Sequence, residues 1–418
     1  MEGGKSKQWV LLAAGSTGWE NYRHQANVCH AYQVMRQNGI PDEQIVVMMY
    51  DDIAYNIDNP DTGKIINEPS GPNVYTGVPK DYTGEEVLAG NFLAVLCGDS
   101  DAVKKPGPKK VIQSGENDTV FIYISGQGRP GLFSFPNSTL YAHDLINTVR
   151  TMSSNGKFSK MVIYTESPNS GSMLNQLNNS NVYGVSACRP AENSYVYHYD
   201  QRLQTYVSDL FTHYWLRHTE TVNLKTTSFG VQFDYMRKNV SQDASRSGKT
   251  QMPCNYSDMN ICSIMLSELL GGSGVSVPGD ISVPPTDFQV SELTDITEVP
   301  LIIQKNRITN EKDPEKRKIL QQQYDDLKRK RKTVDEALQK IAERINASRA
   351  LSEKREVTLT YELKVVAEHF RKNLFDWEKE PHVVTPSHLQ VLVNLCELGL
   401  KVESINEAIT HVSKDLTF

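Results

Sequence analysis

The residues TVFIYISGQG (119–128) and KMVIYTESPNSGS (160–172) decide the fold. Each stretch begins with an apolar run that does not alternate with polar residues, 120–124 in the first and 161–164 in the second, and then passes into Gly, Ser or Pro. A short continuous apolar run is typical of a strand buried on both faces, and the small residues after it indicate a loop at the carboxyl end of that strand.

Three further apolar runs of the same kind lie at residues 9–14, 45–50 and 182–185. Segments with helical spacing, such as 26–38 and 142–152, lie between the runs, so the order is strand, helix, strand. This order predicts an α/β fold with a mainly parallel sheet flanked by helices. Ligand sites in such sheets lie outside the carboxyl ends of the strands, which directs attention to residues 16–24, 125–130 and 166–172.

The chain has 418 residues, of which 39% are hydrophobic and 22% charged, with a formal net charge of -6. These values are typical of a folded globular protein and not of a disordered chain. A net negative charge argues against a nucleic-acid partner, which requires a basic surface. No apolar run approaches the roughly 18 residues of a membrane span.

The pattern divides the chain into three parts. Residues 1–270 carry the α/β pattern, and residues 271–312 begin with a stretch rich in Gly, Ser and Pro that indicates a linker. From residue 313 to 418 the apolar residues recur at helical spacing, and several segments, such as 359–375 and 389–400, carry enough aliphatic residues for a compact bundle. A second, all-helical domain is therefore predicted.

The cysteines and histidines show neither CxxC nor HExxH spacing, so no metal site and no cofactor is predicted. Cys254 and Cys262 flank a short polar segment and can pair in an oxidising compartment, whereas the other four cysteines are interpreted as free thiols. The first residues contain no apolar segment of a signal peptide. Six N-x-S/T sequons nevertheless favour the secretory pathway and glycosylation, at Asn117, Asn137, Asn178, Asn239, Asn255 and Asn346.

Several long stretches resemble the legumain family of asparaginyl endopeptidases, peptidase family C13. They are NYRHQ (21–25), NGIPDEQIVVMMYDDIAY (38–55), GVPKDYTGE (77–85), NFLAV (91–95) and, near the C-terminus, VLVNLCE (391–397). The resemblance spans nearly the whole chain. It implies a caspase-like α/β domain followed by a death-domain-like helical prodomain, and a lysosomal, vacuolar or extracellular location.

Active members of that family carry a His in an Asp-His-Gly loop and a Cys in a Glu-Ala-Cys-Glu-Ser-Gly-Ser loop, with a supporting Asn. On that pattern Asn21 matches the supporting Asn, whereas Gln127 stands at the His position and Pro168 at the Cys position. Gln does not exchange a proton near neutral pH, and Pro has neither a nucleophilic side chain nor a backbone N–H. The resemblance therefore implies a member that has lost both catalytic groups, a pseudoenzyme.

The residues implied in binding a substrate Asn are better preserved. Arg23, His24, Glu166 and Asp209 match the family's S1 pocket, Ser194 matches one of two adjacent serines, and Asn193 replaces the other. An Arg, carboxylates and hydroxyls together offer the donors and acceptors that a carboxamide needs. The same charged groups can instead form a structural ion pair, and that alternative stays open.

The resemblance also extends to the C-terminal part. Asn310 aligns with the site at which active members cut to release the prodomain, and without a nucleophile the chain is expected to keep both domains. Only Cys396 remains of the prodomain cysteines, with Leu374 and Ser413 at two of the other positions. The basic run 328–332 is expected either to stay docked over the acidic pocket or to form a solvated helix face.

Three functions follow from these patterns. The first is a pseudoprotease that binds a peptide or a protein partner, such as a protease or a protease inhibitor, through the retained pocket. The second is an active hydrolase with a substitute nucleophile, in which Ser167 or Ser170 works with His24, or Cys188 with His198. The third is a structural role with a vestigial cleft.

Overall fold

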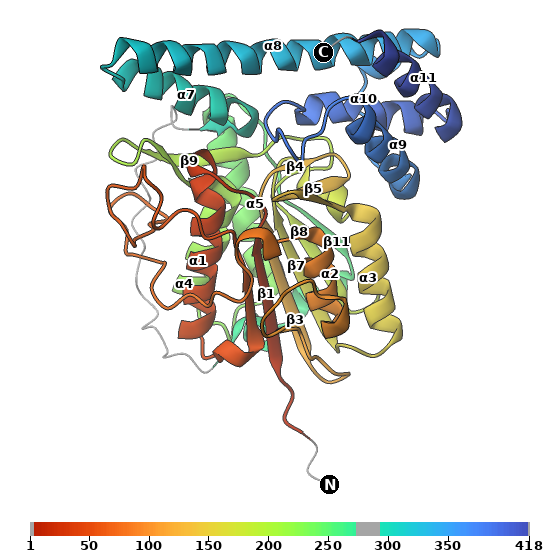
Figure 1. Ribbon diagram of the computed structural model, residues 1–418. Coiled ribbons are helices and arrows are strands. Elements are labelled where there is room, and N and C mark those ends of the chain that lie inside the picture. Colours follow the sequence, from red (N-terminus) through yellow and green to blue (C-terminus); the bar gives the residue numbers. More distant parts are fainter. Residues whose placement is uncertain (1–3, 273–292, 417–418) are drawn as a thin grey trace.

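The central sheet has six strands in the order β11-β8-β7-β3-β1-β2 (Figure 1). The computed structural model describes residues 4–272 and 293–416. The strands are β1 (Gln8–Ala14), β2 (Ile45–Met48), β3 (Thr119–Ser125), β7 (Lys160–Glu166), β8 (Val182–Ser186) and β11 (Cys254–Ser257). All neighbouring strands are parallel except the edge strand β11, which is antiparallel to β8. The predicted mainly parallel sheet is confirmed.

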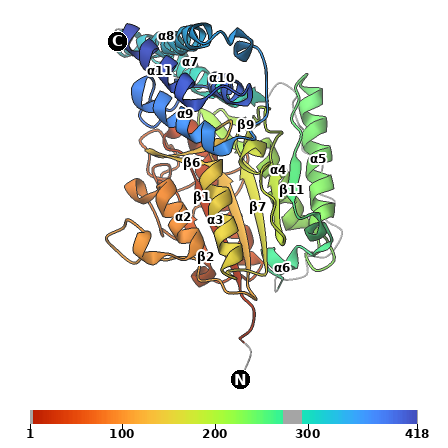
Figure 2. The ribbon, with the colours of Figure 1, turned by 90° about the vertical axis from the view of Figure 1, so that its right-hand side faces the viewer.

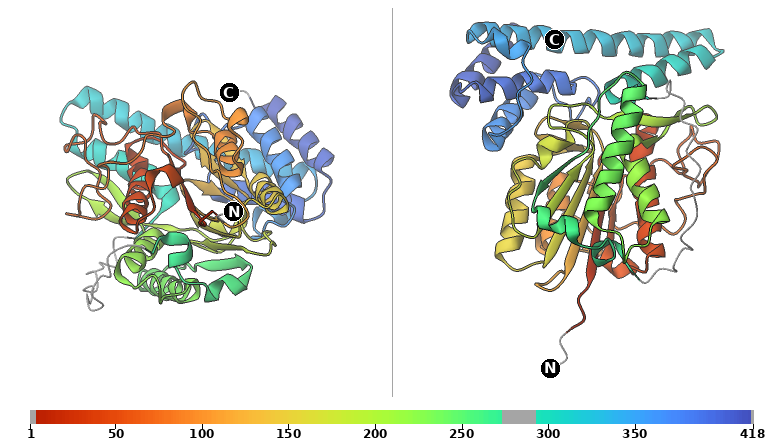
Figure 3. Two further views of the ribbon diagram at one scale, coloured as in Figure 1. Left: turned by 90° about the horizontal axis from the view of Figure 1, so that it is seen from below. Right: turned by 180° about the vertical axis from the view of Figure 1, so that it is seen from behind.

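Helices cover both faces of this sheet, which explains why its strands are apolar without alternation (Figures 1 and 3). Alternate residues of β3 belong to two separate apolar clusters: Phe121 and Tyr123 face one side, and Ile122 and Ile124 face the other. Helices α1 (Tyr22–Gln37), α4 (Leu210–Thr221) and α5 (Phe229–Arg246) pack on the first side. Helices α2 (Ala89–Cys97) and α3 (Ala142–Ser154) pack on the second.

Two small sheets extend the α/β domain at the carboxyl ends of the central strands. One is an antiparallel sheet in the order β10-β9-β12, built from β10 (Thr205–Asp209), β9 (Tyr195–Asp200) and β12 (Thr294–Asp295). The other has the order β4-β5-β6, built from β4 (Gly128–Arg129), β5 (Leu132–Phe135) and β6 (Ser138–Tyr141).

The C-terminal part is helical, as predicted, and lies across the same end of the sheet (Figure 2). Its helices are α7 (Val299–Asn310), α8 (Pro314–Arg344), α9 (Thr360–Asn373), α10 (Pro386–Glu397) and α11 (Val402–Asp415), and the short α6 (Ser267–Leu270) precedes residues 273–292. In α8 the predicted apolar face is buried from Val334 onward, whereas Leu320 and Leu327 are half-buried.

Helix α7 occupies the second part of residues 271–312, the segment interpreted as a linker from its composition and, by the family resemblance, as the start of the activation peptide. Pro300 lies at the beginning of this helix, where the missing N–H costs nothing, so a residue that looks like a breaker in the sequence instead helps to start a helix. The Gly- and Pro-rich residues 273–292, on which the linker prediction mainly rests, lie outside the described residues.

The two domains share apolar packing. Leu132 and Tyr141 of the small sheet β4-β5-β6 belong to the same buried cluster as the core of the helical domain. Gly131 has a φ of 77°, and an added Cβ there would lie 2.3 Å from Leu363 Cδ2, so a larger residue would be strained and would require the Leu363 side chain to move. Across the junction, Lys364 forms an ion pair with Asp144 at 2.8 Å.

The helices within residues 4–272 and 293–416 all lack the length and apolarity needed to cross a membrane.

Candidate peptide-binding site

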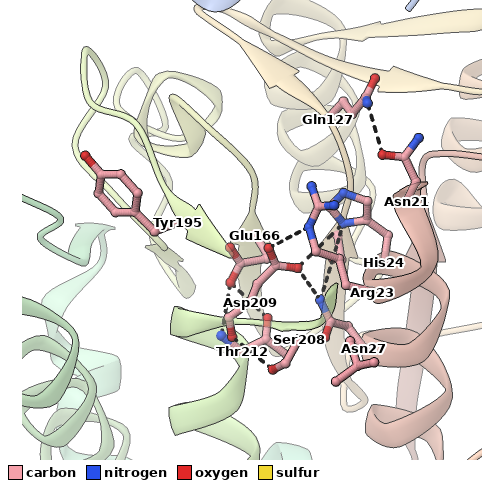
Figure 4. Close-up of polar contacts among 12 residues, drawn as sticks. Asn21, Arg23, His24, Asn27, Gln127, Glu166, Tyr195, Ser208, Asp209 and Thr212 are labelled. Carbon is pink, nitrogen blue, oxygen red and sulfur yellow. Dashed lines mark hydrogen bonds and ion pairs between the residues drawn. The ribbon is translucent and has the colours of Figure 1, made fainter. Parts of the chain in front are cut away.

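Gln127 lies in the loop between β3 and β4, at the carboxyl edge of the central sheet (Figure 4). Its Nε2 donates to Asn21 Oδ1 at 3.1 Å and lies 3.3 Å from Nδ1 of His382, which comes from the helical domain. Nε2 of His382 is 3.2 Å from Oε1 of Glu20. Burial by itself would raise the pKa of Glu20, but the contact with His382 brings that pKa below its ordinary value. The carboxamide of Gln127 is thus fixed between an amide and an imidazole.

Pro168 is buried in the loop that follows β7. An added Cβ at Gly128 would lie 2.4 Å from Ser167 Oγ and 2.5 Å from the Pro168 carbonyl oxygen, so the loops that carry residues 127 and 168 touch each other. Ser167 Oγ donates to the Pro168 carbonyl at 3.1 Å, and Asn169 turns the chain with a φ of 56°. The structure therefore brings the two sequence-predicted positions together, with a carboxamide in one loop and a pyrrolidine ring in the other.

Arg23 and Asp209 form a fully buried ion pair below these loops (Figure 4). Arg23 Nε donates to Asp209 Oδ1 at 3.0 Å, and Asn27, one turn further along α1, donates from Nδ2 to Asp209 Oδ2 at 2.8 Å. Arg23 Nη1 also donates to the Glu20 carbonyl at 3.2 Å. Both oxygens of the Asp209 carboxylate are therefore satisfied by charged or amide donors.

Glu166 is the last residue of β7 and points at the beginning of α4. Its Oε2 accepts hydrogen bonds from the backbone N–H and the hydroxyl of Thr212, at 3.0 and 2.9 Å. Burial, followed by the negative charge of Asp209, raises the pKa of Glu166 well above its ordinary value. Burial also raises the pKa of Asp209, although Arg23 and Asn27 oppose this. One cation serves two buried carboxylates, so we expect Glu166 to hold a proton.

His24 is a neutral member of the same group. Its Nδ1 lies 2.9 Å from Ser125 Oγ, which also accepts from Asn27 Nδ2 at 3.0 Å, so the serine hydroxyl is free to donate to the ring. Burial, and then the charge of Arg23, lowers the pKa of His24 well below its ordinary value. His24 therefore fixes the position of the β3 end and is not exposed to an incoming ligand.

Asn193 and Ser194 lie beside strand β9. Asn193 Nδ2 donates to Asp295 Oδ2 at 3.1 Å, whereas Ser194 is buried and its Oγ has no partner among the described residues. Glu166 Oε1 is likewise buried and without a described partner. Asp295 belongs to β12, which pairs with Tyr195 and Val196 of β9. A segment of the chain's own C-terminal half therefore lies along this edge of the site.

The helical domain covers the site. Arg129 of β4 donates to the carbonyls of Val384 and Pro381, in the loop between α9 and α10, at 2.7 and 2.6 Å. With this loop in place, the side chains expected in the S1 pocket are enclosed: Arg23, His24, Glu166, Ser194 and Asp209 each have 0% exposure.

The basic run 328–332 of α8 only partly takes part in this covering. Arg331 Nε donates to the His382 carbonyl at 2.9 Å, and Lys330 pairs with Glu380 near the same loop. The other basic side chains of the run lie on the surface of α8, as in a solvated helix face.

The groups proposed as substitute nucleophiles are poorly placed. Cys188 is buried with Sγ 3.4 Å from Ser170 Oγ, and burial raises the pKa of its thiol to about 12. Burial lowers the pKa of His198 to about 4. In the described ranges no hydrogen bond joins His24 to Ser167 or Ser170.

The six sequons differ in how their asparagines lie. Asn239 is in the middle of α5 with Nδ2 bonded to the Tyr235 carbonyl at 2.8 Å, and Asn255 is in β11 with Nδ2 3.2 Å from the Tyr183 hydroxyl. The other four asparagines are exposed: Asn117, Asn137, Asn178 and Asn346. Glycosylation stays a prediction, with the exposed positions better suited to carry a glycan in the folded chain.

The structure also shows where the predicted processing residue, Asn310, and the cysteines lie. Asn310 is exposed at the last turn of α7, next to the three-residue connection to α8. Cys254 and Cys262 are half-buried free thiols, so the pairing considered for them is not present, and Cys396 is a buried free thiol. Across 4–272 and 293–416, no three His, Cys, Asp or Glu side chains are grouped so as to hold a metal ion.

Several residues of the site have no signal in the sequence. Asn27 lies four positions after Arg23 and shares its face of α1, but the predicted helix began only at residue 26, so this neighbourhood was not predicted either. Thr212 and Asp295 reach the site through tertiary structure alone, as do Arg129 and His382 at the domain junction.

Comparisons with known proteins show to which family the chain belongs. The sequence profile of the peptidase C13 family matches residues 8–272. The chain belongs to the peptidase C13 family. Over 412 residues, this C13 member is 39% identical to the legumains of Pongo abelii and of Homo sapiens, covering 97% of this chain and 93% of each relative. The hemoglobinase of Schistosoma mansoni is 33% identical over 411 residues, which cover 97% of this chain and 92% of that relative.

Among solved structures, this C13 member matches a caspase-1 from Spodoptera frugiperda with a TM-score of 0.36 at 11% identity, covering 64% of this chain and 92% of that one. The family assignment rests on the sequence comparisons, which extend over both domains of the C13 member.

Proposed function

We propose that this C13 family member is a pseudoprotease that binds an Asn-containing peptide, or a protein that presents one, and does not hydrolyse it. One observation carries the proposal. The adjoining loops that follow β3 and β7 present Gln127 and Pro168, where the family's chemistry requires an imidazole and a thiol.

The loss of both groups removes the reaction at its first step. Attack on a peptide carbonyl needs a thiolate, and departure of the amine needs a proton donor. Gln127 has no titratable proton, and Pro168 has neither a nucleophile nor an N–H that can stabilise an oxyanion. The imidazole that contacts Gln127 is that of His382, which belongs to the helical domain and also contacts Glu20.

The buried group below the loops supports binding of a carboxamide. Glu166 Oε1 and Ser194 Oγ are buried without described partners, and Glu166 lies close enough to Asp209 and Arg23 for their charges to change its pKa. A carboxamide side chain carries one acceptor and two donor hydrogens, so it can satisfy such a mixed set. An aliphatic side chain of the same length leaves these groups unsatisfied, which costs on the order of 1–3 kcal/mol for each group.

Two other parts of the chain lie at this cleft. Strand β12, in the segment between the two domains, pairs with β9, and the loop between α9 and α10 of the helical domain contacts Gln127 through His382. A peptide or protein ligand, including a protease or a protease inhibitor, therefore has to displace these contacts before it can bind. A prodomain that is not cut away keeps the affinity for such ligands low until another protein opens the junction.

Binding calorimetry with the full chain tests the proposal. A blocked Ala-Ala-Asn peptide is expected to bind at least fivefold more tightly than Ala-Ala-Ala. Ser194→Ala is the matched variant, because it removes one hydroxyl and leaves the Arg23–Asp209 pair intact. This variant should show a smaller difference in affinity between the two peptides. Equal affinities for the two peptides would remove the recognition part of the proposal.

A structural role of the cleft is the second candidate, and the full enclosure of Arg23 and Asp209 favours it. On this alternative, substitutions in the pair change stability and no interaction. The Ser194→Ala comparison separates the two, because a hydroxyl without a partner contributes little to stability.

We also propose that the chain follows the secretory pathway to a lysosomal, vacuolar or extracellular location. The four exposed sequons and the relationship to a family that includes a vacuolar-processing enzyme of Arabidopsis thaliana support this.

A further inference from the structure

Two arginines from different domains hold the loop between α9 and α10. Arg129 of β4 donates to the carbonyls of Pro381 and Val384, and Arg331 of α8 donates to the carbonyl of His382, between them. Three carbonyl groups of one short loop are therefore bound by two guanidinium groups that approach from opposite domains.

Neither of these two cations is in direct contact with a carboxylate of the described residues. Arg129 is 3% exposed, and its remaining hydrogen bond goes to the hydroxyl of Ser134, at 2.8 Å. Neither Arg129 nor Arg331 forms an ion pair with any carboxylate in the described part of the chain. Burial, followed by the positive charge of Arg331, lowers the pKa of Arg129 to about 10. Asp295 and Glu298 oppose the effect of burial on Arg331, yet the pKa of Arg331 is still lowered.

A small cavity lies between the two arginines. Its volume is about 30 Å³. Its polar lining residues are Arg129, Arg331, Gln127, His382, Thr297 and Thr385, and the rest of the wall is formed by Gly128, Pro168, Ile296, Pro300, Pro381, Val384 and Pro386. No Asp or Glu is among the lining residues. The Nη groups of Arg331 have no described hydrogen-bond partner, so they are available to a bound group. A cavity of this size holds about one or two water-sized particles, which is too small for a peptide side chain with its backbone.

We propose that this cavity is a binding site for a small inorganic monoanion of the size of chloride, held between Arg129 and Arg331 at the domain junction. The cavity borders on Gln127 and Pro168, and its lining does not include Arg23, Glu166 or Asp209 of the expected S1 pocket. Binding of an anion here rests on the two arginines and does not require that a peptide binds in that pocket. Arginine N–H groups and hydroxyls are the donors that such an anion needs.

The anion links the two domains. It neutralises the repulsion between two guanidinium groups that have to approach each other for the loop to cover Gln127. Binding to the closed arrangement and not to the open one shifts the equilibrium toward the closed arrangement. The helical domain is therefore held more firmly in chloride than in a solution of the same ionic strength that contains only a large anion.

Chloride NMR line widths of the full chain test the site. Sodium gluconate keeps the ionic strength constant, because gluconate is too large for the cavity. The native chain is expected to broaden the chloride signal, and bromide should compete for the site. Arg331→Met should weaken chloride binding about tenfold or more, as expected for loss of a charged donor. Arg329→Met is the control, since Arg329 pairs with Asp326 on the outer surface of the same helix.

Equal broadening by the native chain and both variants would overturn the proposal, as would the absence of broadening by the native chain. A second measurement needs no variant. Crystals of the full chain soaked in bromide should show an anomalous peak between the side chains of Arg129 and Arg331. A saturating soak without a peak at this position contradicts the site.

Discussion

Replacement of Arg23 by Met tests the electrostatics of the buried group. Met fills most of the space of the Arg stem but supplies no charge and no N–H donor. In the native chain Arg23 is the cation of a group that contains the two buried carboxylates Asp209 and Glu166. Without Arg23, Asp209 keeps only its hydrogen bond from Asn27, at 2.8 Å.

The expected loss of stability is large. Removing one partner of a buried ion pair typically costs about 3–5 kcal/mol, because the other charge stays buried and uncompensated. For domains of this size, 1 kcal/mol corresponds to roughly 2–4 °C, so Tm should fall on the order of 10 °C. The double variant Arg23→Met with Asp209→Leu removes the uncompensated charge and should recover most of this loss.

Thermal and urea unfolding of the native chain, the single variant and the double variant measure these values. Arg202→Met is the control, because the Arg202 side chain is 61% exposed in its pair with Asp61 and an exposed pair contributes about 0–1 kcal/mol. An exposed ion pair contributes at most about 1 kcal/mol. The reasoning is therefore refuted if the free energies of unfolding of Arg23→Met and of the control differ by less than about 1 kcal/mol. A double variant no more stable than the single one would refute it as well.

Two further outcomes follow from the structure. Burial lowers the pKa of His218 to about 4, from its ordinary value of 6.5, so the unfolded chain binds this proton more readily. Stability from His218 is present above pH 6.5 and is lost as the pH falls toward 4. In pH-dependent unfolding, the His218→Gln variant should therefore lose on the order of 2 kcal/mol less stability at about pH 5 than the native chain does. The same substitution at the exposed His411 is the control. Asn310 is exposed at the end of α7, so an active C13 protease should cut after it and Asn310→Gln should prevent the cut. The two pieces should still elute together in gel filtration, because the domains share a buried apolar cluster; separate elution would contradict this.

The sequence predicts the fold well because both faces of the central sheet are covered. Residues 120–124 and 161–164 are continuous apolar runs for that reason, and their strands were found at these positions. The linker prediction was less complete, because the composition of residues 271–312 gave no sign of helix α7 at Val299–Asn310, which has Pro300 at its beginning. Local composition does not show whether a proline lies at the beginning of a helix or inside one.

The candidate site was predictable where family resemblance fixes residue identity. The resemblance placed Gln127 and Pro168 in two catalytic loops and Arg23, Glu166 and Asp209 in one pocket. The contact between the two loops and the pairing of Arg23 with Asp209 are findings of the structure. The contacts of His382, Arg129 and Asp295 were not predictable, because they depend on how two domains separated by a long segment dock. Nothing in the local sequence around these three residues encodes that arrangement.

The absence of catalysis is tested most directly by mass spectrometry after incubation with an Asn-directed peptidyl electrophile, at acidic and at neutral pH. The native chain and Arg129→Met should be compared, because the variant loses the guanidinium that holds the covering loop and so exposes Gln127 and Pro168. Both chains are predicted to keep their unmodified mass and to leave an Ala-Ala-Asn fluorogenic peptide intact. A covalent adduct on either chain, or cleavage after Asn by the purified protein, would contradict the account.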